Sequence, residues 1–307
     1  MMLSVIICTY NRDKYIYNVL KSIGTNHFPH NRYEIILIDN NCTDNTSAEC
    51  DRFRKDFPDI PFFYIIEKKQ GLSHARNKGI ETAHGNILIY VDDDATVNNE
   101  YLQTYADFFQ KHSEIIAAGG PILPVYETRE PTWFSPFTKS LITGYLYYGK
   151  QEKPFKNGKY PGGGNVAYRK EVFANVGMFN PNLGRNGENL TGAEEKDIFN
   201  KMRQNGMNFF YLPKAILYHI IPEKKLTADY FKKLTYSIGK SERIRTRNTS
   251  FTQYLKRLIS EAVKWAASIV LCIGYTLCLQ PTKGYKLILF RWNVTKGLLA
   301  LPGGTSH

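Results

Sequence analysis

Residues 86–94 read NILIYVDDD, an apolar and largely β-branched run that ends abruptly in three adjacent aspartates. A run of this length and composition is typical of a buried strand. Three similar runs precede it, at residues 3–8, 33–38 and 62–66, and the segments between the runs are long enough for crossover helices. This alternation predicts an α/β fold with a parallel sheet of the Rossmann-like class.

Each predicted strand is followed by polar residues. The ligand crevice of a parallel sheet lies beyond the carboxyl ends of its strands, so these residues are the first candidates for a binding site. Three of the four strand ends bring acidic groups to this rim. The polar segments are Thr9-Tyr10-Asn11-Arg12, Asp39-Asn40-Asn41, Glu67-Lys68-Lys69 and Asp92-Asp93-Asp94.

The three aspartates at residues 92–94 carry the strongest signal for a site. Adjacent carboxylates repel one another unless a cation or hydrogen-bond donors compensate, and alternate members can direct oxygen atoms at one hard ion. Mg²⁺ or Mn²⁺ suits such ligands and would neutralise the charge on a departing nucleoside diphosphate. The alternative is a solvated turn that caps the next helix, because aspartate favours a helix N-terminus.

Three further features allow a structural and a functional interpretation. Asp39 can accept a hydrogen bond from a nucleotide base or ribose, or it can cap the following helix. Arg76 sits near the start of a predicted helix, where the dipole favours anions, so it either has an anionic partner or is a plain surface residue. Glu194 and Glu195 open a later predicted helix at residues 194–205, either as dipole-compatible caps or as a general base.

The pattern changes in the second half of the chain. Residues 127–164 are rich in proline, glycine and aromatic residues and are predicted to form loops over the site. A strand is predicted at residues 209–212, and from Lys240 onward the chain is basic. Residues 265–279 carry no charge, but this run is shorter than the roughly 20 residues of a spanning helix, which favours a helix in the membrane interface. A buried helix or a dimer interface is the alternative.

Composition limits the protein class. The 307 residues are 43% hydrophobic and 22% charged, which is typical of a folded globular protein with most of its surface in contact with water. The net charge of +12 favours anionic partners such as nucleic acid, phosphorylated ligands or acidic lipid. The five cysteines include no CxxC pair, so they indicate neither a disulfide framework nor a zinc site and fit a reducing compartment. No signal peptide is expected, since an apolar run begins at Leu3.

Taken together, the motifs resemble the family 2 glycosyltransferases with the GT-A fold over roughly residues 3–220. Each motif is weak alone, but six in the same order are specific. The resemblance implies a nucleotide-sugar-binding half (residues 1–125), an acceptor-binding half (residues 126–225) and inverting transfer from a nucleoside diphosphate sugar, with UDP-sugar as the default donor. Residues 226–307 would form a helical extension for the membrane interface or for dimerisation. The motifs lie at residues 4–12, 38–40, 71–79, 92–94, 162–165 and 194–195.

The resemblance also implies roles for single residues. Glu195 would be the general base, with Glu194 as the other carboxylate of the acidic pair, although many family members have aspartate at the second position. Asp94 and Asp92 would hold the divalent cation, with His219 as a supplementary metal or phosphate contact or else a structural histidine. The nucleotide-sugar pocket would comprise Thr9, Tyr10, Asn11, Arg12, Asp39 at the base, Arg76 at the pyrophosphate, Asp92 and Asp93. The floor beneath donor sugar and acceptor would comprise Gly163, Gly164 and Asn165.

The basic extension would bring the enzyme to an anionic cytoplasmic leaflet, with a polyprenyl-diphosphate-linked glycan as the favoured acceptor. We therefore expect a cytoplasmic protein bound peripherally to the inner face of the cell membrane. A sugar-nucleotide nucleotidyltransferase is one alternative, but residues 9–13 lack the glycine-rich phosphate loop that such enzymes usually carry after the first strand. A nucleic-acid-binding protein is another, but an acidic rim opposes a phosphate backbone, so no nucleic-acid partner is expected. A non-catalytic scaffold of the same fold is the third.

Overall fold

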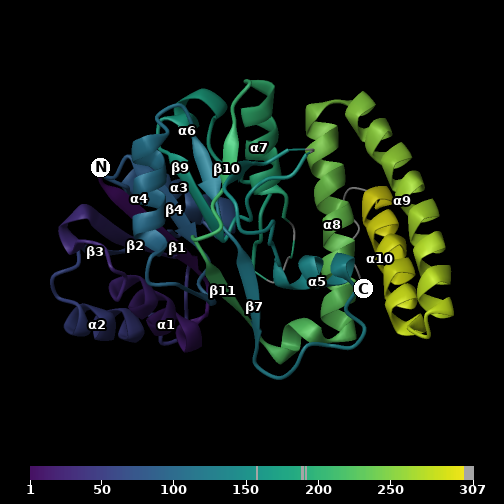
Figure 1. Cartoon of the computed structure of the whole chain (residues 1–307), viewed down its shortest axis with the longest axis horizontal. Helices are drawn as coiled ribbons and strands as arrows, with labels where there is room; N and C mark the ends of the chain where they lie inside the picture. Colours follow the sequence, from purple (N-terminus) through teal and green to yellow (C-terminus); the bar gives the residue numbers. More distant parts are fainter. Residues whose placement is uncertain (157, 188–189, 191, 301–307) are drawn as a thin grey trace. The chain divides into compact units, whose positions relative to one another are not determined.

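The computed structural model describes residues 1–156, 158–187, 190 and 192–300 (Figure 1). The chain divides into two compact units. Unit 1 comprises residues 1–125, 144–181 and 195–220, and unit 2 comprises residues 126–143, 182–194 and 221–307, the last seven of which lie outside the described part. The predicted division into residues 1–225 and 226–307 stays a prediction.

Within the described residues, unit 1 is built on a sheet of eight strands in the order β3-β2-β1-β4-β9-β6-β10-β8. The four predicted strands are confirmed, and they run parallel to one another. β9 pairs antiparallel with β4, so the complete sheet is mixed rather than wholly parallel. The strands are β1 (Leu3–Thr9), β2 (Tyr33–Asp39), β3 (Phe62–Ile66), β4 (Ile87–Val91), β6 (Ala117–Gly119), β8 (Lys153–Pro154), β9 (Asn165–Arg169) and β10 (Phe209–Tyr211).

Helices cover both faces of this sheet, because alternate residues of each strand point to opposite sides. Val5 and Ile7 of β1 pack in one apolar cluster with α1, α2 and α4, whereas Ile6 packs in a second cluster with α3, α6 and α7. The predicted crossover helices and the predicted helix at residues 194–205 are therefore confirmed. The helices are α1 (Asp13–Gly24), α2 (Thr46–Asp56), α3 (Leu72–Thr82), α4 (Tyr101–Lys111), α6 (Val172–Val176) and α7 (Glu194–Gln204), with a 3-10 turn at His30–Arg32.

A small three-stranded sheet has the order β5-β11-β7. β5 (Ala95–Val97) begins directly after the aspartate triplet, and it pairs antiparallel with β11 (Leu217–Ile221). The third strand is β7 (Ile122–Tyr126). This pairing joins the end of β4 to a segment more than 120 residues further along the chain.

Unit 2 contains a helix, α5 (Pro136–Thr143), that the prediction of loops over residues 127–164 missed. Ser135 and Thr138 exchange hydrogen bonds at the start of this helix, as in a capping box. Buried Ile142 then packs with Phe231 in an apolar cluster separate from the sheet. Proline and aromatic content gave no sign of this helix, because its stability depends on a distant partner.

Three long helices follow in unit 2: α8 (Ala228–Thr249), α9 (Phe251–Leu277) and α10 (Pro281–Leu299), after a 3-10 turn at Glu223–Leu226. They lie side by side in green to yellow in Figure 1. α9 has 27 residues and begins fourteen residues before the uncharged run at residues 265–279, so the helix is longer than that run. Among the helices of the described residues, α9 alone is long and apolar enough to cross a membrane by length and composition.

Candidate active site

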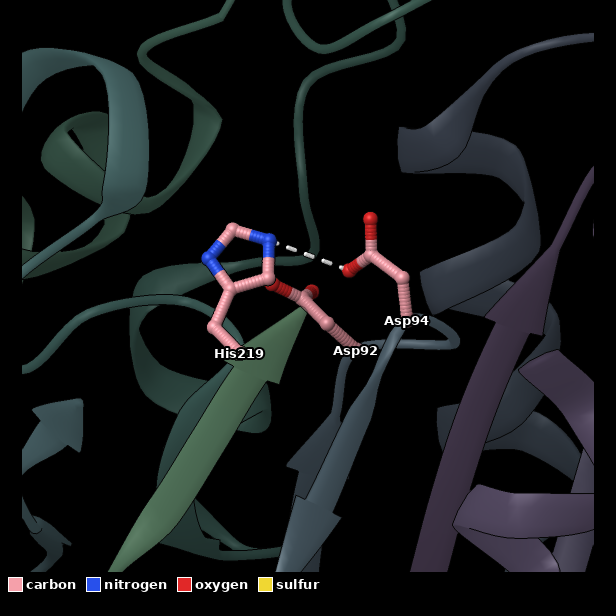
Figure 2. A group of neighbouring side chains, drawn as sticks. All are labelled: Asp92, Asp94 and His219. Carbon is pink, nitrogen blue, oxygen red and sulfur yellow. Dashed lines mark ion pairs between the residues drawn. The ribbon is translucent and has the colours of Figure 1, made fainter. Parts of the chain in front are cut away.

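Asp92, Asp94 and His219 form a candidate metal centre (Figure 2). One ligand atom from each lies within 4.8 Å of the others. The β5–β11 pairing sets His219 opposite Ala95, so that the imidazole Nε2 lies 3.1 Å from Asp94 Oδ1. Figure 2 shows the Asp94 carboxylate and the imidazole facing one another, with Asp92 beside them. Carboxylate oxygens and a ring nitrogen are donors that Mn²⁺ and Mg²⁺ accept.

The end of β1 contributes one positive charge to this centre. Arg12 Nη2 lies 3.8 Å from Asp94 Oδ2, the oxygen that does not face the imidazole. Burial, reinforced by the charge of Asp94, raises the pKa of Asp93 to about 6. Thr9, the last residue of β1, is buried, and Tyr10, which follows it, is 41% exposed. Three carboxyl groups next to one guanidinium make this edge of the sheet attractive to a cation.

Two glycines pass directly over two carboxylates. A Cβ atom on Gly163 would overlap the Glu195 carboxylate, and a Cβ atom on Gly164 would overlap the Asp92 carboxylate. The Asp92 N–H donates a hydrogen bond of 3.3 Å to the Gly164 carbonyl, which continues the β4–β9 pairing by one step. A side chain at either position would displace a carboxylate, and these two adjacent loop residues thereby keep the candidate base close to the candidate metal centre.

Glu195 is held by Arg76 of α3. The Arg76 Nη1 atom lies 2.7 Å from Glu195 Oε1, and its Nη2 donates to the Gly163 carbonyl at 3.4 Å. The guanidinium is 4% exposed and packs 5.3 Å from the ring centroid of Phe179. The anionic partner expected for Arg76 is therefore Glu195, and a role at the pyrophosphate stays a prediction. Of the acidic pair, the Glu195 side chain is 22% exposed, whereas Glu194 is buried.

The ends of β1 and β2 are tied together beside these groups. Asp39 is buried, with Oδ1 accepting from the Cys42 N–H at 2.6 Å and Oδ2 accepting from the Tyr64 hydroxyl. Asn11 has a positive φ of 53°, which asparagine tolerates better than most residues, and its Oδ1 accepts from the Thr43 N–H at 2.8 Å. Residues predicted to bind the nucleotide, Asn11 and Asp39 among them, therefore lie at one edge of unit 1.

A family model named glycosyl transferase family 2 matches residues 4–177, which is more than half of the chain. The chain belongs to this family. The glycosyltransferase is 26% identical over 250 residues to the glucosyl-dolichyl phosphate glucuronosyltransferase of Haloferax volcanii, a match that covers 80% of this chain and 77% of that relative. Family membership decides against a nucleotidyltransferase and against a nucleic-acid-binding protein.

Solved structures share the fold of this glycosyltransferase. The mannosyltransferase PcManGT of Pyrobaculum calidifontis, in complex with GDP-Man and Mn²⁺, has a TM-score of 0.64 and 17% identity, covering 97% of this chain and 87% of that one. Residues 1–349 of TarS from S. aureus, in complex with UDP-GlcNAc, have a TM-score of 0.54 and 17% identity, covering 96% and 91%. The predicted GT-A fold with a C-terminal helical extension is confirmed.

Asn165 is buried in this glycosyltransferase, and its predicted place in the floor beneath the sugar stays a prediction. The residue is 0% exposed. Its Oδ1 accepts from the Tyr101 and Tyr105 hydroxyls at 2.8 Å, and its Nδ2 donates to the carbonyls of Pro121 and Ala215 at 2.7 and 2.9 Å. Protein groups therefore use both ends of the amide, so Asn165 positions the two glycines that precede it.

Asn40 is an organising residue that the sequence did not single out. Its Nδ2 donates to the carbonyls of Glu67 and Lys69 at 2.9 and 2.8 Å, and its Oδ1 accepts from the Gly71 N–H at 2.7 Å. These bonds join the end of β2 to the turn that starts α3, the helix of Arg76. The partners lie about 30 residues away, so no local pattern could have revealed them.

Proposed function

We propose that this glycosyltransferase moves a sugar with inversion from a nucleoside diphosphate sugar, UDP-sugar by default, to a hydroxyl of a lipid-linked glycan. The observation that carries the proposal is the contact of Gly163 and Gly164 with the carboxylates of Glu195 and Asp92. A base and a metal ligand that contact two adjacent loop residues lie close enough for a single displacement at one carbon atom. The bound GDP-Man of PcManGT and UDP-GlcNAc of TarS support the class of donor.

Glu195 acts as the general base in this proposal. It takes the proton of the acceptor hydroxyl as the oxygen forms a bond to the anomeric carbon, and the bond from that carbon to the diphosphate breaks with its electron pair on the leaving nucleotide. Attack from the face opposite the leaving group inverts the stereochemistry. Arg76 holds one oxygen of the carboxylate and so fixes the position of the base. The partial exposure of Glu195 favours it over buried Glu194 as the base.

Asp92, Asp94 and His219 fit a divalent cation, since their donor atoms converge within 4.8 Å and their types suit Mg²⁺ or Mn²⁺. A cation there would offset the charge that develops on the departing diphosphate. Arg12, next to Asp94, would add a second positive group on the same side. Thr9, Tyr10, Asn11, Asp39 and Asp93 would line the nucleotide pocket around them.

The acceptor and the location form the last part of the proposal. The relative from Haloferax volcanii is named for a glucosyl-dolichyl phosphate substrate, which is a lipid-linked sugar. We assign a polyprenyl-diphosphate-linked glycan to this chain as acceptor, and the cytoplasmic face of the cell membrane as the place of reaction. The basic residues of the C-terminal extension would hold the enzyme near anionic lipid there.

A donor panel tests the function. Purified protein is incubated with UDP-, GDP- and dTDP-sugars, each with Mg²⁺, with Mn²⁺ or with EDTA, and nucleotide release is measured. We expect release from a UDP-sugar with either metal and its loss in EDTA. Glu195→Gln should lower the rate by about 10²–10⁴-fold, the range that a general base contributes.

Two variants serve as controls for the Glu195 substitution. Glu194→Gln tests the neighbouring carboxylate and should retain activity if Glu195 is the base. Glu171→Gln removes an exposed carboxylate at the start of α6, away from the acidic pair, and should behave as wild type. Near-wild-type release by Glu195→Gln would reject the assigned base, and release that EDTA leaves unchanged would reject the metal.

A further inference from the structure

Helix α9 has an inverted distribution of polar and apolar residues. Its buried residues are Tyr254, Glu261 and Ser268, which recur every seven positions on one face. A helix that faces water normally buries its apolar residues and exposes its polar ones. Large apolar side chains lie instead on the outside of α9. They are Phe251, Leu255, Ile259, Val263, Ile269, Val270, Ile273 and Leu277, each between 43% and 79% exposed.

These exposed side chains form one continuous surface, here named the outer face of α9. Most successive members are three or four positions apart; Ile269 and Val270 are adjacent, and exposed Ala266 lies midway in the six-residue step from Val263 to Ile269. At 3.6 residues per turn they fall within about 120° of the helix circumference. Helix α10 adds a row of its own with a seven-residue repeat: Tyr285, Trp292 and Leu299 are 63%, 52% and 58% exposed.

The polar inner face of α9 is fully occupied by α8 and α10. Glu261 pairs with Arg257 at 2.8 Å and with Arg291 of α10 at 3.1 Å, and Arg257 also pairs with Glu242 of α8 at 3.1 Å. Each of these side chains is at most 10% exposed. The Trp265 indole N–H donates to the Thr295 hydroxyl of α10 at 2.9 Å. A helix that buries its charged side chains against other helices and exposes its apolar side chains is typical of a protein surface in contact with lipid.

The same ion pairs argue against a membrane-spanning α9. The helix is long enough to span, with a mean hydropathy of 1.4 in its most apolar window. A spanning helix would have to leave α8 and α10, and Glu261, Arg257 and Arg291 would then lose their partners at a large cost in free energy. With its inner face retained, α9 can enter a bilayer only sideways, through the outer face.

The positive charge of residues 226–307 favours a lipid surface over a second copy of the chain as the partner of the outer face of α9. Residues 226–307 contain thirteen Lys and Arg but three Asp and Glu, a net charge of +10 out of +12 for the whole chain. Each of the three acids already pairs with a base of unit 2: Glu242 and Glu261 within the buried network, and Asp229 with Lys233. Two such surfaces would repel one another in a symmetric dimer, whereas an anionic bilayer attracts them.

We propose that the outer face of α9, extended by Tyr285 and Trp292, embeds in the surface of an anionic phospholipid bilayer with the helix axis along the membrane plane. Aromatic rings and flanking lysines, among them Lys256 and Lys264, suit the headgroup region. This inference rests on the proposed function, because it supplies the surface that holds the enzyme beside a lipid-linked acceptor.

Flotation with preformed vesicles tests the proposal. The full chain is mixed with phosphatidylcholine vesicles with or without phosphatidylglycerol, and the bound fraction is measured. The double variant Val270→Asn with Ile273→Asn removes two apolar side chains of the outer face at no change in charge. We expect wild type to float with anionic vesicles and the double variant to lose at least about tenfold in partitioning.

The control is Val125→Asn with Met178→Asn, which replaces two exposed apolar residues of unit 1, 46% and 41% exposed, and should float as wild type does. Nucleotide release without vesicles reports folding of each variant and the proposed function separately from binding. Unbound wild type, or a double variant that still floats, overturns the inference. So does light scattering that shows a dimer in wild type and a monomer in the double variant, which would assign the outer face to a second copy.

Discussion

At the scale of single residues, the candidate site depends on two glycines at which any side chain would displace a carboxylate. Gly163→Ala would place a methyl group where the Glu195 carboxylate lies. The obstructing atoms are the far end of a flexible side chain, so the fold should survive while the carboxylate moves. A displacement of this size can cost about 10²-fold in rate, and we expect that loss in the kcat of nucleotide release.

Gly274→Ala is the matched control for this substitution, because a Cβ atom there meets open space. It should leave kcat unchanged. Circular dichroism of both variants should match that of wild type, and Gly274→Ala, which lies within helix α9, should not lower the thermal midpoint. Unchanged kcat for Gly163→Ala would show that Glu195 does not need its present position, and it would weaken the assignment of the base.

The sequence alone located some of these residues and missed others for a physical reason. The aspartate triplet could be found because an apolar strand ends there, and the glycine run because glycine is so often required where backbone passes close to other groups. The burial of Asn165 among Tyr101 and Tyr105 depends on partners about 60 residues away, so no local pattern indicates it. His219 reaches Asp94 only through the β5–β11 pairing.

At the scale of elements, buried Glu34 joins β2 to β1 and to the turn before β4. Its carboxylate accepts hydrogen bonds from Ser4 Oγ at 2.5 Å, from the His84 N–H at 2.7 Å and from the Gly85 N–H at 3.3 Å. Burial alone would raise the pKa of Glu34, but these bonds outweigh it and lower the pKa below 4.5. A carboxyl group whose pKa is lower in the folded than in the unfolded state stabilises the fold at any pH above its unfolded-state pKa. This stability is lost as the pH falls through the folded-state pKa.

We therefore expect Glu34→Gln to lower the free energy of unfolding at pH 7 by about 1–3 kcal/mol, the cost of a disrupted buried bond to a charged group. The deficit should shrink below about pH 4.5 in urea unfolding, as wild type loses the same contribution. Glu114→Gln, which removes an exposed carboxylate 3.4 Å from His112, should cost under about 1 kcal/mol. A deficit that stays constant down to pH 3 would contradict this account.

Elements differ in how far periodicity predicts them. β1, β2 and β4 are buried on both faces, whereas β3 is a partly exposed edge strand, but each of the four appears as a continuous apolar run and its bounds could be predicted within one residue. The apolar run in α9 was visible, but its first fourteen residues mix lysine, arginine and glutamate with apolar residues and concealed where the helix begins. Of those charges, Arg257 and Glu261 are buried against α8 and α10, and only the packed structure reveals that.

At the scale of the whole molecule, charge is unevenly distributed along the chain. Residues 1–225 carry a net charge of +2, against +10 for residues 226–307. The predicted attraction to an anionic surface therefore belongs to the extension, whereas nucleotide binding depends on a few charges within unit 1. Ionic strength should separate the two activities, because salt shortens the screening length from about 10 Å at 0.1 M to about 3 Å at 1 M.

We expect added NaCl to release the protein from phosphatidylglycerol vesicles steeply, while nucleotide release in solution changes less. The apolar contribution of the outer face of α9 is insensitive to screening, so binding should level off at the value measured on pure phosphatidylcholine rather than vanish. Val270→Asn with Ile273→Asn should lower that plateau and leave the salt-dependent part intact, because its charge is that of wild type. Binding that falls to zero in salt for wild type would mean that charge acts alone, and the apolar outer face would then need another partner.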